Sequence, residues 1–385
     1  MHIVFAHNFY QQAGGEDTVV AQEMALLRSA GHKVSLYERH NDEIKGLWPK
    51  MEVAFSTAYS RKSRNDFGKY LESRSPDVVH VHNFFPLLTP SIYDACRALD
   101  IPVVQTLHNF RITCAGGLLM RDGAVCELCV NGSPYQAVKY RCYRESVFGS
   151  TVLAHMISTH RKKQTWSNKV DRIIALTDFS RSKYIAAGVA AEKIAVKPNF
   201  IDDPLSGGAI EFPASRNGAL YVGRLSAEKG IDVLLSAWKH IDEPLRIVGD
   251  GPLRTLVEGC GRDNVHYLGK LPHDKVSEEM IKASFLVMPS IWYEGFPMVL
   301  VEAFAHGLPV VASNIGNLAE IINDKETGFL FETGSSEALC AVVNSIREDS
   351  AMRSASQALA RETFVKKYSP ETNLELLIEI YRGVM

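Results

Sequence analysis

The sequence predicts an α/β protein with two doubly wound, Rossmann-like domains that face each other across a cleft. Apolar runs with the length of strands alternate with helical patterns almost throughout the 385 residues, and this alternation indicates parallel sheets. The pattern breaks after Pro198, in a stretch rich in Gly, Pro and Ser, and then starts again. We therefore expect a first domain over residues 1–198, a linker over 199–217 and a second domain over 218–368.

The first domain opens with a strand at His2–Ala6, and a loop that ends in two glycines leads to a helix at Glu16–Ala30. No basic leader precedes this strand, and no run in the sequence approaches the roughly 18 apolar residues of a membrane span. We therefore expect a cytoplasmic protein. Further apolar runs predict the remaining strands of this domain at Lys33–Tyr37, Asp77–Val81, Pro102–Leu107, Arg172–Thr177 and Lys193–Lys197.

The second domain repeats the same alternation of strands and helices, and a final helix from about Glu371 to Arg382 follows Ser369-Pro370. A doubly wound sheet binds ligands outside the carboxyl ends of its strands, so the loops that follow the strands are the candidate sites. The expected strands are Ala219–Val222, Leu245–Val248, Val265–Leu268, Phe285–Met288, Pro309–Ala312 and Gly328–Phe331.

The charge is divided unevenly between the two halves of the chain. The composition, with 46% hydrophobic and 22% charged residues, is that of an ordinary soluble globular protein, and the net charge is −2. Residues 1–197 carry a net charge of +7 and residues 198–385 carry −9. A basic first half indicates an anionic partner for that half, although chance is the alternative. We expect no nucleic-acid partner.

In the middle of the second domain a strand, a tight turn and a helix start follow one another. Pro297 stands where a first helical position is expected, and Met298–Ala305 carries the helical pattern. Such a turn aims backbone N–H groups at one point, which the helix dipole makes attractive to anions. Glu294 lies in the turn and Glu302 on the apolar helix, where a carboxylate needs a partner such as a pair of ligand hydroxyls. The alternative is a nearby lysine for Glu302 and solvent for Glu294.

The stretch from Glu294 to Glu302 resembles the signature of retaining nucleotide-sugar glycosyltransferases of the GT-B fold, in the large family-four group. The segment Gly223-Arg-Leu-Ser-Ala-Glu-Lys-Gly230 resembles a second motif of this group. The resemblance implies that Arg224 and Lys229 bind the donor diphosphate, that Glu294 binds the donor-sugar hydroxyls and that Glu302 binds the ribose diol. It also implies that the final helix, in residues 369–385, crosses back to the first domain.

Arg224 and Lys229 attract attention even without this resemblance, because both lie in a strand-to-helix connection of the second domain. Two cations there can neutralise a diphosphate, the arginine as a fork and the lysine as a point charge. The alternative is a surface loop with two unrelated charges. Gly249-Asp-Gly251 is a similar turn, whose glycines allow close approach to a ligand but also suit an ordinary tight turn. The resemblance adds these donor-binding residues: Gly223, Gly251, Leu271, Gly295, Phe296, Pro297 and Met298.

The loop Gly14-Gly15-Glu16, after the first strand, resembles the Gly-Gly-x-Glu loop of the same group. The resemblance implies that the backbone N–H of Gly15 approaches the transferred sugar and the β-phosphate. Here the acid follows the glycines directly, and Asp17 comes next, so the role of Glu16 stays open.

His108 ends a predicted strand of the first domain, and the resemblance implies that it contacts the donor sugar. A core histidine is the alternative, and Asn109 follows where the group often has Asp. His80 and His82 alternate on an earlier strand and are predicted to line the acceptor pocket.

These features predict a retaining, metal-independent transferase that moves a sugar from a nucleotide-diphosphate sugar to a hydroxyl of a saccharide or lipid-linked saccharide, in surface polysaccharide or glycolipid synthesis. The sequence contains no Asp-x-Asp to hold a catalytic divalent ion, so no cofactor is expected for catalysis. The alternatives are transfer to a small soluble acceptor, another activity on this fold such as an epimerase or a phosphorylase, and a non-catalytic partner subunit.

A basic stretch in the first domain favours a lipid-linked acceptor at the inner face of the cell membrane. Residues 135–172 hold eight Lys and Arg against Glu145 and Asp171, and residues 147–157 have an amphipathic helical pattern. Such a helix can lie on an anionic membrane as a peripheral contact, but an ordinary surface helix with a core face is the alternative.

Four of the seven cysteines lie close together in the sequence, and two of them form a Cys-x2-Cys knuckle. A cytoplasmic protein is not expected to hold these as stable disulfides. The spacing suits a closed, structural zinc site with four thiolates, and the alternative is four reduced thiols in a small hairpin. The cysteines are Cys114, Cys126, Cys129 and Cys142.

Overall fold

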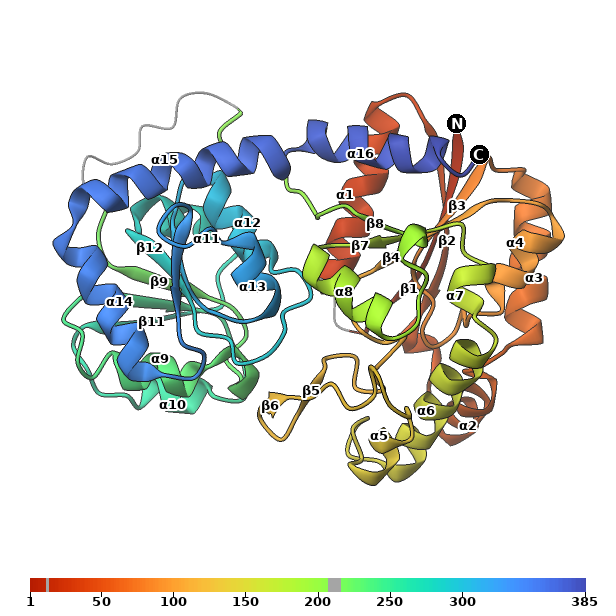
Figure 1. Ribbon diagram of the computed structural model, residues 1–385, viewed down its shortest axis with the longest axis horizontal. Helices are drawn as coiled ribbons and strands as arrows, with labels where there is room; N and C mark the ends of the chain where they lie inside the picture. Colours follow the sequence, from red (N-terminus) through yellow and green to blue (C-terminus); the bar gives the residue numbers. More distant parts are fainter. Residues whose placement is uncertain (12–13, 207–215) are drawn as a thin grey trace. The chain divides into compact units, whose positions relative to one another are not determined.

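The computed structural model describes residues 1–11, 14–206 and 216–385, and the chain divides into two compact units (Figure 1). Residues 207–215 of the predicted linker lie outside the described residues. Within the described part of the chain, no helix combines the length and the apolar character needed to cross a membrane. The first unit comprises Met1–Arg121, Cys126–Asn199 and Asn373–Met385, and the second comprises Asp122–Val125 and Phe200–Thr372.

The first unit contains a six-stranded sheet with the order β2-β1-β3-β4-β7-β8, in which all neighbouring strands are parallel. The order reverses between β1 and β3, which makes a topological switch point there. All six predicted strands are present, and β1 and β2 are longer than predicted. The strands are β1 (His2–Phe9), β2 (Lys33–His40), β3 (Val78–Asn83), β4 (Val103–Leu107), β7 (Arg172–Ala175) and β8 (Ile194–Val196).

The final helix, α16 (Pro370–Arg382), contributes Leu377 and Tyr381 to the core of the first unit, where they lie in one cluster with Phe5 and Leu27. The predicted return of this helix to the first unit is therefore confirmed. The other helices described in this unit are α1 (Gly15–Ser29), α2 (Leu47–Ser56), α3 (Arg61–Arg74), α4 (Ile92–Ala98), α5 (Gln136–Lys139), α6 (Val147–Lys162), α7 (Thr165–Asn168) and α8 (Asp178–Ala186), with 3₁₀ turns η1 (Asn41–Glu43) and η2 (Ala191–Lys193).

The second unit contains another six-stranded parallel sheet, with the order β11-β10-β9-β12-β13-β14. Its order reverses between β9 and β12, so the loops after these two strands border the switch point. The predicted strands are all present: β9 (Ala219–Val222), β10 (Leu245–Val248), β11 (Val265–Gly269), β12 (Phe285–Met288), β13 (Val310–Ser313) and β14 (Gly328–Phe331).

Helices pack on both faces of the second sheet, as Figure 1 shows. One core cluster joins Leu220 and Leu286 to Phe304, and the other joins Tyr221 and Phe285 to residues of helices that pack on the opposite face. The predicted α/β class with two doubly wound domains is thus confirmed. The helices are α9 (Ile231–Ala237), α10 (Arg254–Glu258), α11 (His273–Lys282), α12 (Met298–Ala305), α13 (Gly316–Ile321), α14 (Ser336–Glu348) and α15 (Ser350–Lys367), with the 3₁₀ turn η3 (Ala227–Lys229).

Two very short strands were not expected from the sequence. They are β5 (Met120–Arg121) and β6 (Ala124–Val125), and they form a separate two-stranded sheet. They lie within the cysteine-containing segment, where the polar, turn-rich sequence gives no strand signal of the usual length.

Candidate active site

The loop after β9 is held tightly against the loop after β12, at the switch point of the second sheet. The N–H of Ile291 donates to the carbonyl of Glu228 at 3.0 Å. Gly230 has a φ of 71°, and a Cβ at this position would lie 1.9 Å from the carbonyl oxygen of Pro289. Only glycine fits such an approach without a shift of the backbone. The two motifs that the sequence analysis singled out are therefore neighbours.

The carboxylate of Glu294 is the best-bonded polar group of the loop after β12. Its two oxygens accept hydrogen bonds from Lys229 Nζ at 2.7 and 2.8 Å, and one of them also accepts from Ser290 Oγ at 2.6 Å and from Trp292 Nε1 at 3.2 Å. Asn317 donates to the backbone carbonyl of Glu294. The side chain of Glu294 is only 6% exposed, so the alternative of a solvated loop charge is wrong.

Arg224 has a different environment from Lys229, although both belong to the same motif. Its side chain is exposed and forms no ion pair with the described residues. The preceding N–H, that of Gly223, donates to the carbonyl of Val248 at 3.0 Å, so the backbone beneath the guanidinium is fixed. The structure therefore brings Lys229 together with Glu294 but leaves Arg224 turned to solvent.

The other predicted donor residues border the same loops. Gly251 lies in the turn after β10, where a Cβ would lie 2.4 Å from the carbonyl oxygen of Leu225. The side chains of Leu271, Phe296 and Met298 pack against the core of the second unit. Because these side chains are used in the core, a ligand can form hydrogen bonds only with the backbone of these residues.

The helix α12 spans Met298–Ala305, as predicted, and Pro297 is its cap instead of its first helical residue. Pro297 is the residue that precedes the helix, with a φ of −78°. A proline has no N–H, and the N–H groups of the first turn have no acceptor within a helix in any case. The start of α12, directly after Gly295 and Phe296, therefore keeps the anion-attracting character that the sequence predicted.

Glu302 lies on α12 with a side chain that is 19% exposed. Its neighbour is His273 Nε2, at 3.7 Å, rather than the lysine that the alternative interpretation required. The interaction with Glu302 raises the pKa of His273, whose own side chain is 78% exposed. The carboxylate of Glu302 is therefore partly open to solvent and has only a weak ion-pair contact.

In the first unit, Gly15 is the first residue of α1, and Gly14 precedes it as the cap. The acid that organises this loop is Asp17, not Glu16. Asp17 Oδ2 accepts a hydrogen bond from the Gly14 N–H at 3.0 Å, and Asp17 Oδ1 lies 2.8 Å from His7 Nε2. This is one half of a capping box, because Gly14 has no side chain that could accept from the N–H of Asp17 in return. Glu16 instead accepts from the hydroxyl of Tyr10 at 2.9 Å.

His108 follows β4, is half-buried, and lines a small pocket with Phe85, Asn109 and Arg111. His82 lines the same pocket, and its Nδ1 lies 2.9 Å from Nε2 of His108. The environment of His108 is therefore that of a pocket residue, in contrast to the alternative of a core histidine.

The prediction that His80 lines an acceptor pocket is wrong. Its side chain is 0% exposed, and its ring nitrogens contact Tyr381 Oη at 2.7 Å and Thr106 Oγ1 at 2.8 Å. The reason is the return of α16 to this sheet, which covers His80 with Tyr381. An alternating pattern on one strand does not reveal a helix that arrives 301 residues later in the sequence.

Two buried charged residues near these histidines were missed by the sequence analysis. Lys197 Nζ lies 2.7 Å from Glu23 Oε1, and both side chains are 0% exposed. Burial alone would raise the pKa of Glu23, but the positive charge of Lys197 and the neighbouring histidines hold it well below its usual range. Burial lowers the pKa of His80, His82 and His108. A hint was available, because Glu23 falls on the apolar face of α1, which buries Val19, Val20 and Leu27.

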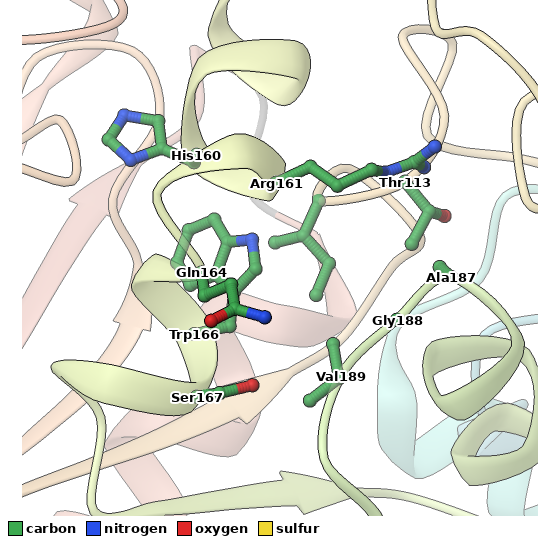
Figure 2. A pocket seen from close by; sticks show the side chains of 10 residues that line it. Thr113, His160, Arg161, Gln164, Trp166, Ser167, Ala187, Gly188 and Val189 are labelled. Carbon is green, nitrogen blue, oxygen red and sulfur yellow. The ribbon is translucent and has the colours of Figure 1, made fainter.

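Another pocket of the first unit lies between the end of α6, α7 and the loop Ala187–Val189, and contains none of the predicted site residues (Figure 2). Figure 2 shows His160 and Arg161 leaving α6 in different directions. His160 is bonded to Thr165 and to the carbonyl of Ala58, and Arg161 donates to the carbonyls of Gly132 and Cys129, at 2.8 Å each. These groups serve the fold, so we assign no ligand to this pocket.

The helix α6 buries its apolar face within the first unit, through Leu153, Met156 and Ile157. Its amphipathic pattern therefore reflects packing inside the protein, as the alternative interpretation held. Only its first turn leaves large apolar side chains in solvent, with Val147 49% and Phe148 54% exposed.

The four cysteines of the predicted zinc site lie near one another but do not form a compact cluster. Burial, followed by the neighbouring thiols of Cys114, Cys142 and Cys126, raises the pKa of Cys129 to about 11. Among the described residues, however, no group that includes these sulfurs has three ligand atoms within 4.8 Å of one another. The predicted zinc site stays a prediction, and zinc binding would require the sulfurs to move closer together.

Comparisons with known proteins match this arrangement of two units. Residues 13–204 match the family model described as Glycosyltransferase Family 4, and residues 208–363 match the model described as Glycosyl transferases group 1. An uncharacterised glycosyltransferase of Methanocaldococcus jannaschii is 36% identical over 96% of this chain and 95% of its own length. A phosphatidyl-myo-inositol mannosyltransferase of Mycolicibacterium smegmatis is 25% identical over 96% of this chain and 90% of its own.

Solved structures agree on the fold. The Anabaena protein Alr3699/HepE, in complex with UDP and glucose, has a TM-score of 0.70 and 18% identity, and each chain is covered completely. Sucrose-phosphate synthase of Thermosynechococcus elongatus has a TM-score of 0.69 and 20% identity over 99% of this chain and 98% of its own. The solved structures show the fold alone, whereas the family matches and the archaeal relative also show the family. This chain is a glycosyltransferase of family 4, with the GT-B architecture.

Proposed function

We propose that the protein transfers a sugar, with retention of configuration, from a nucleotide-diphosphate sugar to a hydroxyl of a saccharide or a lipid-linked saccharide. The observation that supports this most strongly is the Lys229–Glu294 pair at the switch point of the second sheet. A doubly wound sheet binds nucleotides at such a point, and the pair places a cation and a hydroxyl acceptor side by side.

The diphosphate is proposed to bind between Arg224, Lys229 and the start of α12. Lys229 has three N–H donors, and Glu294 accepts at two short distances, which leaves donor capacity for a phosphate oxygen. Arg224 is exposed and can bring its planar guanidinium onto the same anion. Glu302 is assigned to the ribose diol, because an ionised carboxylate accepts two hydrogen bonds from neighbouring hydroxyls.

Catalysis is proposed to depend on these fixed charges, without a metal ion. The bond between the sugar and the diphosphate breaks through an oxocarbenium-like transition state, and negative charge grows on the leaving diphosphate. Arg224, Lys229 and the first N–H groups of α12 stabilise that charge in place. Front-face attack, with the leaving phosphate taking the acceptor proton, gives retention and requires no protein general base.

Thermal-shift measurements against a panel of nucleotide-diphosphate sugars test the donor assignment. A bound donor stabilises the folded protein by about 2.7 kcal/mol at a concentration of 100 Kd, so the cognate donor is expected to raise Tm clearly. The shift should be absent in Lys229→Ala and retained in Lys239→Ala, an exposed lysine of the same unit. Anomeric NMR of the product then tests retention. An equal shift in wild type and Lys229→Ala contradicts the assignment.

The acceptor is proposed to be lipid-linked and to be reached by the first unit from an anionic membrane surface. The helix α2 leaves Trp48 85% exposed and Phe55 76% exposed, and it packs near α6, whose first turn exposes Phe148. Exposed lysines and arginines accompany these apolar side chains, among them Lys50 and Arg144. Aromatic side chains with basic neighbours are the combination that binds anionic lipid surfaces.

A further inference from the structure

A line of polar side chains runs behind His108 through the interior of the first unit. Lys197 Nζ lies 2.7 Å from Glu23 Oε1, Glu23 Oε2 lies 3.4 Å from His82 Nε2, and His82 Nδ1 lies 2.9 Å from His108 Nε2. The side chains of Lys197, Glu23 and His82 are 0% exposed. These residues come from α1, from β3 and from the ends of β4 and β8, so only the folded unit assembles the line.

The same place is also the one group of possible metal ligands found among the described residues, with Glu23, His80 and His82 offering atoms within 4.8 Å of one another. A cation is already present there, because Lys197 donates to Glu23 and also to Asn373 Oδ1 at 3.2 Å. His80 uses both ring nitrogens in hydrogen bonds within the protein. We therefore assign no metal to this group, and the ammonium supplies the positive charge.

The stability of the fold does not account for this arrangement by itself. A buried ion pair is weak evidence for stability, because the cost of removing both charges from water offsets much of their attraction. What a buried carboxylate does control is the position of protons on the groups next to it. Glu23 is ionised, so each of its oxygens can only accept a hydrogen bond.

The positions of the ring protons follow in sequence from Glu23. Glu23 Oε2 and His82 Nε2 face each other at 3.4 Å without a hydrogen bond, and neither atom has another hydrogen-bond partner among the described residues. The carboxylate charge favours the His82 tautomer with its proton on Nε2, because an N–H there is attracted to the negative charge, and a neutral imidazole then has a bare Nδ1. His82 Nδ1 in turn accepts from His108, so His108 carries its proton on Nε2. The remaining nitrogen of His108, Nδ1, is left as a hydrogen-bond acceptor.

We propose that Glu23 and His82 are positioning residues for sugar transfer, which hold His108 in the tautomer whose Nδ1 accepts a hydrogen bond from a sugar hydroxyl. The inference rests on the proposed function and on the sugar contact that the resemblance implies for His108. The half-buried His108 lines the pocket with Asn109 and Arg111, which places its ring where a ligand can reach it. Lys197 keeps Glu23 ionised, and the negative charge of Glu23 then fixes which nitrogen carries the proton in His82 and in His108.

The other titratable groups around His82 do not disturb this assignment. The ring of His7 lies 6.4 Å from that of His82, and Asp17 accepts from His7 Nε2 at 2.8 Å. The ring of His80 lies 4.2 Å away, and its nitrogens are bonded to Tyr381 and Thr106. Burial keeps His82 and His108 neutral near pH 7, which the tautomer argument requires.

Long-range ¹H–¹⁵N NMR of the full-length protein reads the two tautomers directly, without reference to activity. The expected result in the wild type is a neutral ring with the proton on Nε2 for both His82 and His108. In Glu23→Gln/Lys197→Met, which removes both buried charges at similar volume, we expect a mixture of tautomers at both rings. Glu38→Gln, an exposed carboxylate of the same unit, is the matched control and should leave both signals unchanged.

Kinetics then separate a positioning role from a structural one. With a nucleotide-sugar donor, Glu23→Gln/Lys197→Met is expected to lower kcat by about ten- to a hundredfold, the scale found for groups that orient metal-binding histidines, with a smaller change in KM. His82→Phe should lose as much, since it keeps a ring that stacks on Phe5 but has no nitrogen. His82→Gln, which still accepts from His108, should recover part of the activity.

The outcomes distinguish the positioning role of Glu23 and His82 from the proposed function. The positioning role is overturned if His108 of the wild type carries its proton on Nδ1. It is also overturned if the tautomers change in the double variant while kcat and KM stay at wild-type values. If the wild type shows the expected tautomers but turns over no nucleotide sugar, the proposed function fails instead, and with it the assignment of a sugar to His108.

Discussion

Glu294 and Glu302 make different contacts, so neutralising each carboxylate is expected to change the kinetic constants in a different way. Glu294→Gln keeps the shape of the side chain but removes the charge that pairs with Lys229, so we expect a loss of about a hundredfold in kcat/KM, mainly in kcat. Glu302→Gln weakens ground-state binding of the ribose and should mainly raise KM for the donor. Steady-state kinetics with varied donor concentration measure both. Identical changes in the two variants would contradict the separate roles.

The motif residues could be predicted from the sequence, but their partners could not. Gly230 and Lys229 stand at fixed distances from a strand, so local spacing places them in the loop. The bond from Lys229 to Glu294 joins residues 65 positions apart, and that from Lys197 to Glu23 joins residues 174 positions apart. Such pairs depend on which strands become neighbours, and no local pattern carries that information.

The strands of the two six-stranded sheets followed from periodicity with errors only at their ends, whereas β5 and β6 were missed. The strand β1 continues to Phe9, three residues past the predicted end, because the polar residues His7 and Asn8 are buried by side-chain hydrogen bonds to Asp17 and Asn41. The helix α6 was visible as an amphipathic pattern, but its partner was not: the pattern is the same for a helix that packs on a core and one that packs on a membrane.

The cysteine segment around β5 and β6 gives a prediction about metal content. If four thiolates bind zinc there, protein purified without a polyhistidine tag should carry about one equivalent of zinc, and removal of the metal should lower the Tm of the first unit. Cys126→Ser/Cys129→Ser should lose the metal, whereas Cys260→Ser/Cys340→Ser, in the second unit, should keep it. Less than about a tenth of an equivalent of zinc, with four titrating thiols in this segment, would count against the site.

The histidine cluster makes the stability of the first unit depend on pH. The pKa of His80 and of His82 lies below 6.5 in the folded state and returns to 6.5 on unfolding, so the unfolded state binds more protons. The free energy of unfolding is therefore highest above pH 6.5. It decreases as the pH is lowered through 6.5, by up to about 1.4 kcal/mol per pH unit for each group. Denaturant unfolding at pH 7.5 and 5.5 measures this. His80→Gln should reduce the slope and the exposed His240→Gln should not; a flat profile in the wild type would refute the account.

The division of charge over the whole chain, +7 in residues 1–197 and −9 in 198–385, gives a prediction about membranes. We expect binding to anionic vesicles that falls as salt rises, because screening weakens the attraction of the basic first unit. Trp48→Ser/Phe55→Ser should weaken binding, and Leu256→Ser, an exposed apolar residue of the second unit, should leave it unchanged. Vesicle co-sedimentation at two salt concentrations measures this, and equal binding to neutral and anionic vesicles would count against an anionic membrane as the partner.

The central claim is that the loops after β9 and β12 bind and activate a nucleotide-diphosphate sugar. The most direct measurement is donor turnover by Arg224→Ala/Lys229→Ala beside the wild type and the control Lys239→Ala, with far-UV circular dichroism to confirm the fold. Loss of the two cations should cost on the order of 3 kcal/mol or more in the transition state, a loss of at least about a hundredfold in kcat/KM, while Lys239→Ala stays at the wild-type rate. Turnover by the folded double variant at the wild-type rate would contradict the claim.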